Sequence, residues 1–117
     1  MQVTSTSPVS LQLKRQGGTV IQSRIDFWSA TPNGWQLASS DVFQRVTKPV
    51  EQQSAKLAKG QYTAVFSCRV EESVNGKFEF EFDVNGVAIY ADKGNVNTTP
   101  DPHDAKVYKD QFVLNVV

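Results

Sequence analysis

The sequence has 117 residues, the length of one ordinary domain, and 39% of them are hydrophobic while 21% are charged. These proportions exclude both a disordered chain and a membrane-embedded one. Twelve basic side chains balance twelve acidic ones, so no global field draws the chain to nucleic acid or to an anionic membrane. We therefore expect a single domain over residues 1–117, with neither nucleic acid nor membrane as a partner.

The first residues, MQVTSTSPVSLQLKRQ, lack the basic stretch and following apolar stretch of a Sec signal. Cys68 is the one cysteine of the chain, which excludes an internal disulfide and is typical of a reducing compartment. Its alternation with Phe66 and Val70 predicts a buried, unreactive thiol. By default we expect a cytoplasmic location, with export by a route that reads no Sec signal as the alternative.

Hydrophobic residues alternate with polar ones through most of the chain, which is the period of β-strands, and helical periodicity is hard to find. Turn signals rich in Gly, Asn and Pro separate the alternating segments. About seven or eight short strands of this kind predict an all-β fold, an antiparallel β-sandwich of immunoglobulin-like or jelly-roll-like type. In chain order, the segments are residues 9–15, 21–27, 34–39, 62–70, 78–84, 87–91 and 112–116.

The segment at residues 21–27 sets a buried parity through Ile21, Ile25 and Phe27. If Trp35 lies opposite Phe27, then Trp35 and Leu37 belong to the core, and residues 28–34 form the connection between the strands. Trp28 then points outward, on the same face as Arg24 and Asp26. An outward tryptophan at a strand end can stack on a sugar or fill a pocket of a protein partner. The alternatives are a bend in the strand or a loop that covers the ring.

Residues 40–60 mix apolar and polar positions without a clean period. Residues 51–59 fit either a short helical turn or a strand that leads into a turn at Gly60. Val42, Phe43 and Val46 are expected to pack as an edge segment, because Pro49 restricts this stretch to an edge or a loop.

The clearest alternation is KFEFEFDVNGVAIYAD, residues 77–92, with phenylalanines on one face and acidic residues on the other. A two-residue turn at Asn85-Gly86 predicts a hairpin register that keeps apolar residues opposite one another. Its apolar pairs are Val84–Val87, Phe82–Ile89 and Phe80–Ala91. Its outer pairs are Asp83–Ala88, Glu81–Tyr90 and Glu79–Asp92.

A three-residue turn at Asn75-Gly76-Lys77 would also pair this strand with residues 68–74, with Val74 opposite Phe78. In that arrangement Arg69 lies beside Asp83, and Glu71 lies beside Glu81. The outer face would then be largely acidic. It fits either a solvated sheet face or a site for a basic partner or a cation.

Candidate chemistry is sparse. Glu79 and Glu81 lie about 7 Å apart on one face, a spacing that glycosidase carboxylates also use, but they share the same solvent and their pKa values would not separate. Oxygen-bearing residues of the loop near residues 93–106 do not match an EF-hand, and a single histidine makes no Ser-His-Asp set. We therefore expect that the chain is not an enzyme and that it binds neither a metal nor a cofactor. The loop residues considered are Asp92, Asn95, Asn97, Asp101, His103 and Asp104.

Together these observations favour a non-enzymatic binding or assembly module that recognises another protein, or a copy of itself, through its open sheet face or its loops. The alternative is a small lectin-like glycan-binding domain, with calcium assistance as an option. Fold class alone does not decide between them. The residues expected to bind the ligand or partner are Arg24, Asp26, Trp28, Glu79, Glu81, Tyr90 and Asp92.

Overall fold

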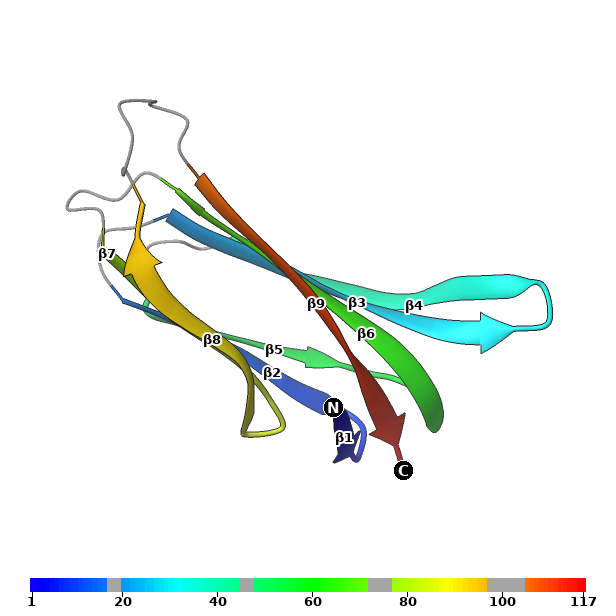
Figure 1. Ribbon diagram of the computed structural model, residues 1–117. Coiled ribbons are helices and arrows are strands. Elements are labelled where there is room, and N and C mark those ends of the chain that lie inside the picture. Colours follow the sequence, from blue (N-terminus) through cyan, green and yellow to red (C-terminus); the bar gives the residue numbers. More distant parts are fainter. Residues whose placement is uncertain (17–19, 45–47, 72–76, 97–104) are drawn as a thin grey trace.

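The computed structural model describes residues 1–16, 20–44, 48–71, 77–96 and 105–117 (Figure 1). These residues form nine strands and no helix, against the seven or eight strands expected. No helix in this part of the chain is long and apolar enough to cross a membrane. The strands are β1 (Gln2–Ser5), β2 (Val9–Gln16), β3 (Val20–Thr31), β4 (Gly34–Phe43), β5 (Val50–Ala55), β6 (Gly60–Glu71), β7 (Lys77–Val84), β8 (Val87–Asn95) and β9 (Ala105–Val116).

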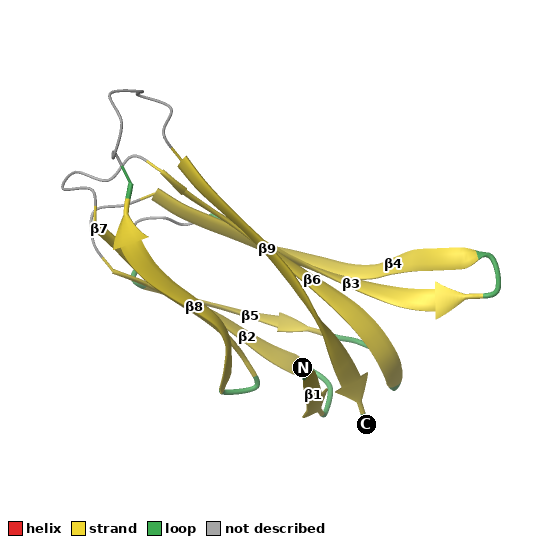
Figure 2. Ribbon diagram, viewed as in Figure 1, coloured by secondary structure: helices red, strands yellow, loops and turns green. Residues whose placement is uncertain are grey.

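The strands form two sheets that pack face to face as a β-sandwich, which confirms the predicted fold class (Figure 2). Sheet A has the order β1-β9-β6-β3-β4, and sheet B has the order β5-β2-β7-β8. Neighbouring strands are antiparallel except for β1, which runs parallel to the last residues of β9. The predicted inward parity holds for Cys68, Phe80 and Phe82, which are all buried. Phe66 of sheet A stacks on Phe82 of sheet B with 4.5 Å between ring centroids, so aromatic packing joins the two layers.

The predicted hairpin between residues 68–74 and β7 is wrong. β6 belongs to sheet A, where it pairs with β3 and β9, whereas β7 belongs to sheet B and pairs with β2 and β8. Apolar residues therefore match across β2 and β7, as in the pair Leu13–Phe82. Arg69 does not lie beside Asp83, nor Glu71 beside Glu81. The turn residues Asn75-Gly76, and Val74 of the predicted Val74–Phe78 pair, lie outside the described residues.

The β7–β8 hairpin follows the prediction only next to its turn. Val84 pairs with Val87 and Asp83 with Ala88, but an irregularity beyond Asp83 leaves Ile89 as an extra residue. A bulge of this kind turns two successive side chains toward one face, and here both Ile89 and Tyr90 pack against the core. The remaining predicted pairs are therefore wrong by one residue. The observed pairs are Phe82–Tyr90, Glu81–Ala91, Phe80–Asp92 and Glu79–Lys93.

The assignment of Trp35 and Leu37 to the core is also wrong, since Trp35 is 62% exposed and Leu37 is 41% exposed. β3 continues to Thr31, which pairs with Gly34 across a two-residue turn, so residues 28–34 are not a loop. Trp35 lies opposite Ala30, and Leu37 opposite Trp28. We call residues 28–38 the arm. Its hairpin extends past the strands of sheet B, so no second layer covers it (Figure 1).

Residues 40–60 contain an edge strand from each sheet. Val42 and Phe43 end β4, the edge of sheet A, as expected for an edge segment, while Val46 lies outside the described residues. β5 begins directly after Pro49 and forms the edge of sheet B. The strand reading of the stretch that begins at Glu51 is therefore correct, and the helical turn is not formed.

Arg15 continues the inward parity of Leu11 and Leu13, which places a guanidinium inside the sandwich. Its Nη2 donates to Glu51 Oε1 of β5 at 2.9 Å, and its Nε donates to the carbonyl of Ile21 at 2.9 Å. Buried charges of this kind are stable only when paired and hydrogen-bonded. The ion pair links β2 to β5, and the hydrogen bond to Ile21 links β2 to β3, at the end of the sandwich away from the arm.

Candidate functional site

The residues predicted to bind a partner do not meet in one place. Those on β3 lie on the outer face of sheet A, those on β7 lie on the outer face of sheet B, and those on β8 lie at the seam beside β9. The three groups are Arg24, Asp26 and Trp28; Glu79 and Glu81; and Tyr90 and Asp92.

The acidic row of β7 is paired with lysines on the outer face of sheet B. Lys14 Nζ lies 3.1 Å from Glu81 Oε2 and 3.2 Å from Asp83 Oδ2, and Glu79 lies opposite Lys93. The predicted repulsive pairs, Glu71 with Glu81 and Glu79 with Asp92, are thus absent. An open hollow of about 480 Å³ on this face is lined by both charge signs, among them Lys14, Glu79 and Lys93. Such a mixture gives no net attraction for a basic partner.

The two carboxyl groups next to Lys14 differ in their titration. Hydrogen bonds to Asp83 and then to Lys14 lower the pKa of Glu81. Burial, followed by the hydrogen bond with Glu81, raises the pKa of Asp83. Hydrogen bonds to both carboxyl groups raise the pKa of Lys14, so the lysine stays charged between them. This cluster is a cross-strand ion-pair network between β2 and β7.

Metal ligands do not gather in the described part of the chain, where no group of three or more His, Cys, Asp or Glu residues could hold an ion. Asn97, Asp101, His103 and Asp104, which the sequence offered as oxygen or nitrogen ligands, lie outside the described residues.

Tyr90 and Asp92 lie at the seam between β8 and β9. The half-buried ring of Tyr90 packs against Phe66, Phe80 and Tyr108, with centroids 5.5 to 6.0 Å apart. Burial and a hydrogen bond to Asp92 raise the pKa of Tyr108. The bulge at Ile89 thus turns Tyr90 toward the core and away from the outer face, where the sequence had placed it beside Glu81.

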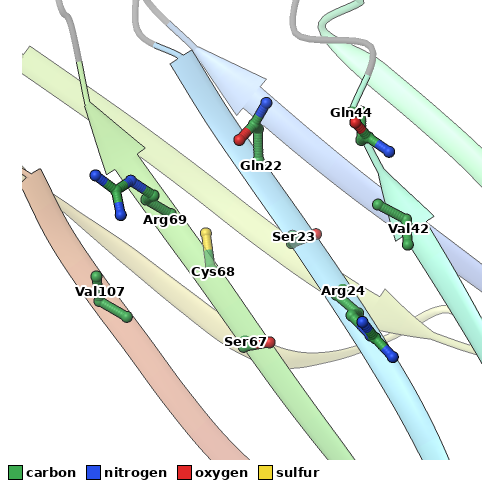
Figure 3. Close-up of a pocket in the computed structure, with 9 residues that line it drawn as sticks. All are labelled: Gln22, Ser23, Arg24, Val42, Gln44, Ser67, Cys68, Arg69 and Val107. Carbon is green, nitrogen blue, oxygen red and sulfur yellow. The ribbon is translucent and has the colours of Figure 1, made fainter.

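The outer face of sheet A carries a hollow of about 350 Å³ that spans β9, β6, β3 and β4 (Figure 3). Both of its arginines are paired: Arg24 Nε lies 2.8 Å from Asp26, and Arg69 Nε lies 3.0 Å from Glu71. Cys68, also in the lining, is 2% exposed, and burial raises its pKa to about 12. The predicted burial of the thiol is confirmed, and a buried thiol with a raised pKa is a poor nucleophile.

The arm carries two outward tryptophans, of which only Trp28 was predicted to face outward. Trp28 lies on the outer face of sheet A, as predicted, and Trp35 lies near it on the same face. Together they line an open groove of about 480 Å³ with Thr63, Val65 and Gln111 of the neighbouring strands. The two-residue turn rule that was applied at Asn85-Gly86 would have placed Trp35 here if applied at Pro32-Asn33 as well.

No family model matches the sequence, and no curated protein matches it. Among solved structures, the chain is similar to the crystal structure of a DUF4425 family protein from Bacteroides ovatus. The two are 15% identical over 93% of this chain and 96% of that one, with a TM-score of 0.43. A likeness at this level assigns neither a family nor a function to the chain.

Proposed function

We propose that this chain is a non-enzymatic protein-binding or assembly module whose contact surface is the arm together with the adjoining outer face of sheet A. The observation that carries the proposal is the exposure of Trp35, at 62%, on a hairpin without a charged residue between Phe27 and Ser40. Isolated exposed apolar residues need no explanation, but Trp28, Trp35 and Leu37 form a contiguous group.

The composition of this group supports a protein partner. Tryptophan is enriched at the centres of protein interfaces, and charged residues are depleted there. The outer face of sheet B has the opposite character, because Lys14 forms ion pairs with both Glu81 and Asp83 within the chain. The proposal therefore moves the binding surface from the acidic row to the arm. It also includes a reducing compartment such as the cytoplasm, which the unpaired thiol of Cys68 supports.

The proposal can be tested with tagged protein added to lysate of the cells that produce it, followed by quantitative mass spectrometry of what is retained. We compare the wild type with a Trp35→Ser/Leu37→Ser variant and with a matched Lys14→Ser/Glu81→Ser variant on sheet B. We expect the arm variant to lose proteins that the wild type and the sheet B variant both retain. Retention of the same proteins by the arm variant would contradict the proposal.

A glycan ligand is the second candidate, and the groove between Trp28 and Trp35 favours it. Aromatic rings stack on sugars, and Thr63 and Gln111 add hydrogen-bonding groups to the same groove. A glycan array with wild-type protein and Trp28→Ala, each with and without calcium, separates the two functions. Binding to a defined glycan that disappears in Trp28→Ala would support the lectin-like alternative.

A further inference from the structure

We propose that the partner of the arm is a second copy of this chain, joined by antiparallel pairing of the two β4 edges about a twofold axis at Gln36. The inference rests on the proposed function and names the partner of that same surface. It follows from the hydrogen-bonding direction of β4, from the order of its side chains and from its lack of charge.

The edge of β4 is free along the arm. In the described part of the chain no strand lies beyond β4 in sheet A, and β3 is its one neighbour in that sheet. Thr31 and Gly34 flank a two-residue turn, so they hydrogen-bond to each other. By alternation, the backbone N–H and C=O groups of Trp35 and Leu37 then point away from β3, toward the open edge.

The other end of the same edge supports this direction. Ala38 is the extra residue of the β3–β4 irregularity, and beyond it the alternation predicts that Val42 also points its carbonyl away from β3. Gln53 Nε2 of β5 donates a hydrogen bond to that carbonyl. β5 therefore covers the end of the edge near the body of the sandwich, whereas the stretch from Gly34 to Leu37 extends past it.

The edge is self-complementary about Gln36. In an antiparallel pair centred there, Trp35 lies opposite Leu37 of the second copy, and Leu37 lies opposite its Trp35. Each of these pairs exchanges two backbone hydrogen bonds. Because Trp35 and Leu37 share the outer face, each indole also packs on a leucine of the other copy. A twofold axis at Trp35 would instead place Leu37 opposite the turn, so the axis at Gln36 is the one that pairs both apolar residues.

The charge of the edge favours an identical partner. β4 contains neither Lys nor Pro, which commonly block edge pairing, and its one charged residue, Asp41, lies beyond the arm. A charged ligand would find no counter-charge between Phe27 and Ser40. Two uncharged edges, in contrast, can pair without burying an unpaired charge. The arm extends past sheet B (Figure 1), so in the antiparallel arrangement each body would lie beyond the tip of the other arm and the two sandwiches would stay apart.

The contact involves few residues on each side, compared with roughly twenty to thirty in a standard interface. We therefore expect a reversible dimer whose population rises with concentration by mass action. The two chains contribute the same patch, as in other twofold interfaces, so pairing closes at the dimer and does not propagate into a filament.

Cysteine cross-linking tests the register directly. At the axis, Gln36 faces its own copy in a pair without backbone hydrogen bonds, where Cα atoms lie about 4.5 Å apart, within disulfide reach. We expect Gln36→Cys to form a covalent dimer under mild oxidation, while Asn33→Cys, exposed in the turn, forms little. Cys68 is buried in both variants and does not compete. Equal rates of cross-linking at both positions would overturn the register.

Analytical ultracentrifugation over roughly a hundredfold range of concentration tests the dimer itself. We expect the wild type to shift from monomer toward dimer, and Leu37→Lys to remain monomeric with unchanged circular dichroism. Val87→Lys is the matched control, since Val87 is 52% exposed on sheet B, and it should behave like the wild type. A wild type that stays monomeric, or a Leu37→Lys variant that dimerises equally, would overturn the proposal.

The two proposals fail in different ways. If the wild type is monomeric but the Trp35→Ser/Leu37→Ser variant still loses retained proteins, the second copy is excluded and protein binding by the arm stands. If neither dimerisation nor retention responds to the arm substitutions, both proposals fall.

Discussion

The outer face of sheet B and the arm are both exposed, yet they differ in how far the chain satisfies its own side chains. On sheet B, Lys14 lies between Glu81 and Asp83, and Lys93 lies opposite Glu79, so each acidic group has a basic neighbour on an adjacent strand. On the arm, Trp35 and Leu37 are exposed without a charged residue nearby in the hairpin. The most regular pattern in the sequence is therefore explained within the fold, whereas a less regular stretch offers unsatisfied apolar surface.

The largest expected effect distinguishes the interior of the sandwich from the arm, and it comes from truncating one aromatic residue in each. Phe82 is fully buried and stacks on Phe66, so Phe82→Ala should lower the free energy of unfolding by about 3 to 5 kcal/mol. Trp35→Ala removes a larger side chain, but from an exposed position, and should change it by less than about 1 kcal/mol. Urea unfolding followed by circular dichroism measures both. A comparable loss in Trp35→Ala would mean that the arm is part of the folding core.

The second prediction contrasts the buried ion pair with the exposed one. Glu51→Gln removes the carboxylate that pairs with the buried Arg15 guanidinium, and breaking a buried ion pair typically costs about 3 to 5 kcal/mol. We expect the urea midpoint to fall clearly in this variant. Lys14→Gln removes the exposed pair with Glu81 together with the contact to the buried Asp83, and should move the midpoint less. An equal effect of the two substitutions would contradict the view that the ion pairs of sheet B contribute little to stability.

Alternation determined which side chains face inward, because period-two burial depends on local sequence alone. Phe80, Phe82 and Cys68 were placed correctly for this reason. Alternation does not say which strands are neighbours: the inner faces of both sheets are apolar, so β7 fits β6 in the sequence as well as it fits β2. The choice between them depends on the whole sandwich, and β6 has its hydrogen bonds taken by β3 and β9.

The predicted register is wrong where a single extra residue enters a strand. Ile89 shifts the β7–β8 pairs by one, and Ala38 does the same between β3 and β4. A bulge leaves no mark in a hydrophobic pattern, yet it reverses the parity of every residue beyond it. The predicted site on β8 was affected most, because Tyr90 faces inward and Asp92 does not lie opposite Glu79. Trp28 was placed correctly because it lies within the regular part of β3.

A smaller effect is expected at Asp41, on the inward side of β4 where the arm leaves the body. Burial raises the pKa of Asp41 from its ordinary value of 3.8, and its Oδ2 has no hydrogen-bond partner. A raised folded-state pKa means that ionisation destabilises the fold, so stability contributed by the protonated form is lost as pH rises from 3.8 through the raised pKa. Asp41→Asn should therefore be more stable than the wild type at neutral pH, by less than about 1 kcal/mol.

Urea midpoints of Asp41→Asn and the wild type, measured from acidic to neutral pH, give the sign. The difference should shrink toward acidic pH, where Asp41 is protonated in both the folded and the unfolded chain. Asp83, whose pKa is also raised, is present in both proteins and cancels in the comparison. A variant that is less stable than the wild type at neutral pH would show that the carboxylate has a favourable partner in solution.

The smallest expected effect is that of calcium on the acidic face. Calcium prefers about six to eight oxygen ligands, and a cation bound only to the native state would raise stability by about 2.7 kcal/mol at a hundredfold excess over its dissociation constant. Glu79 and Glu81 instead have Lys93 and Lys14 as neighbours, and Asp92 interacts with Tyr108. Millimolar calcium should therefore shift the thermal midpoint no more than sodium chloride of equal ionic strength, because screening is then its only action. A calcium-specific rise of several degrees that disappears in Asp92→Asn would contradict this, and would return the binding site from the arm to the acidic row.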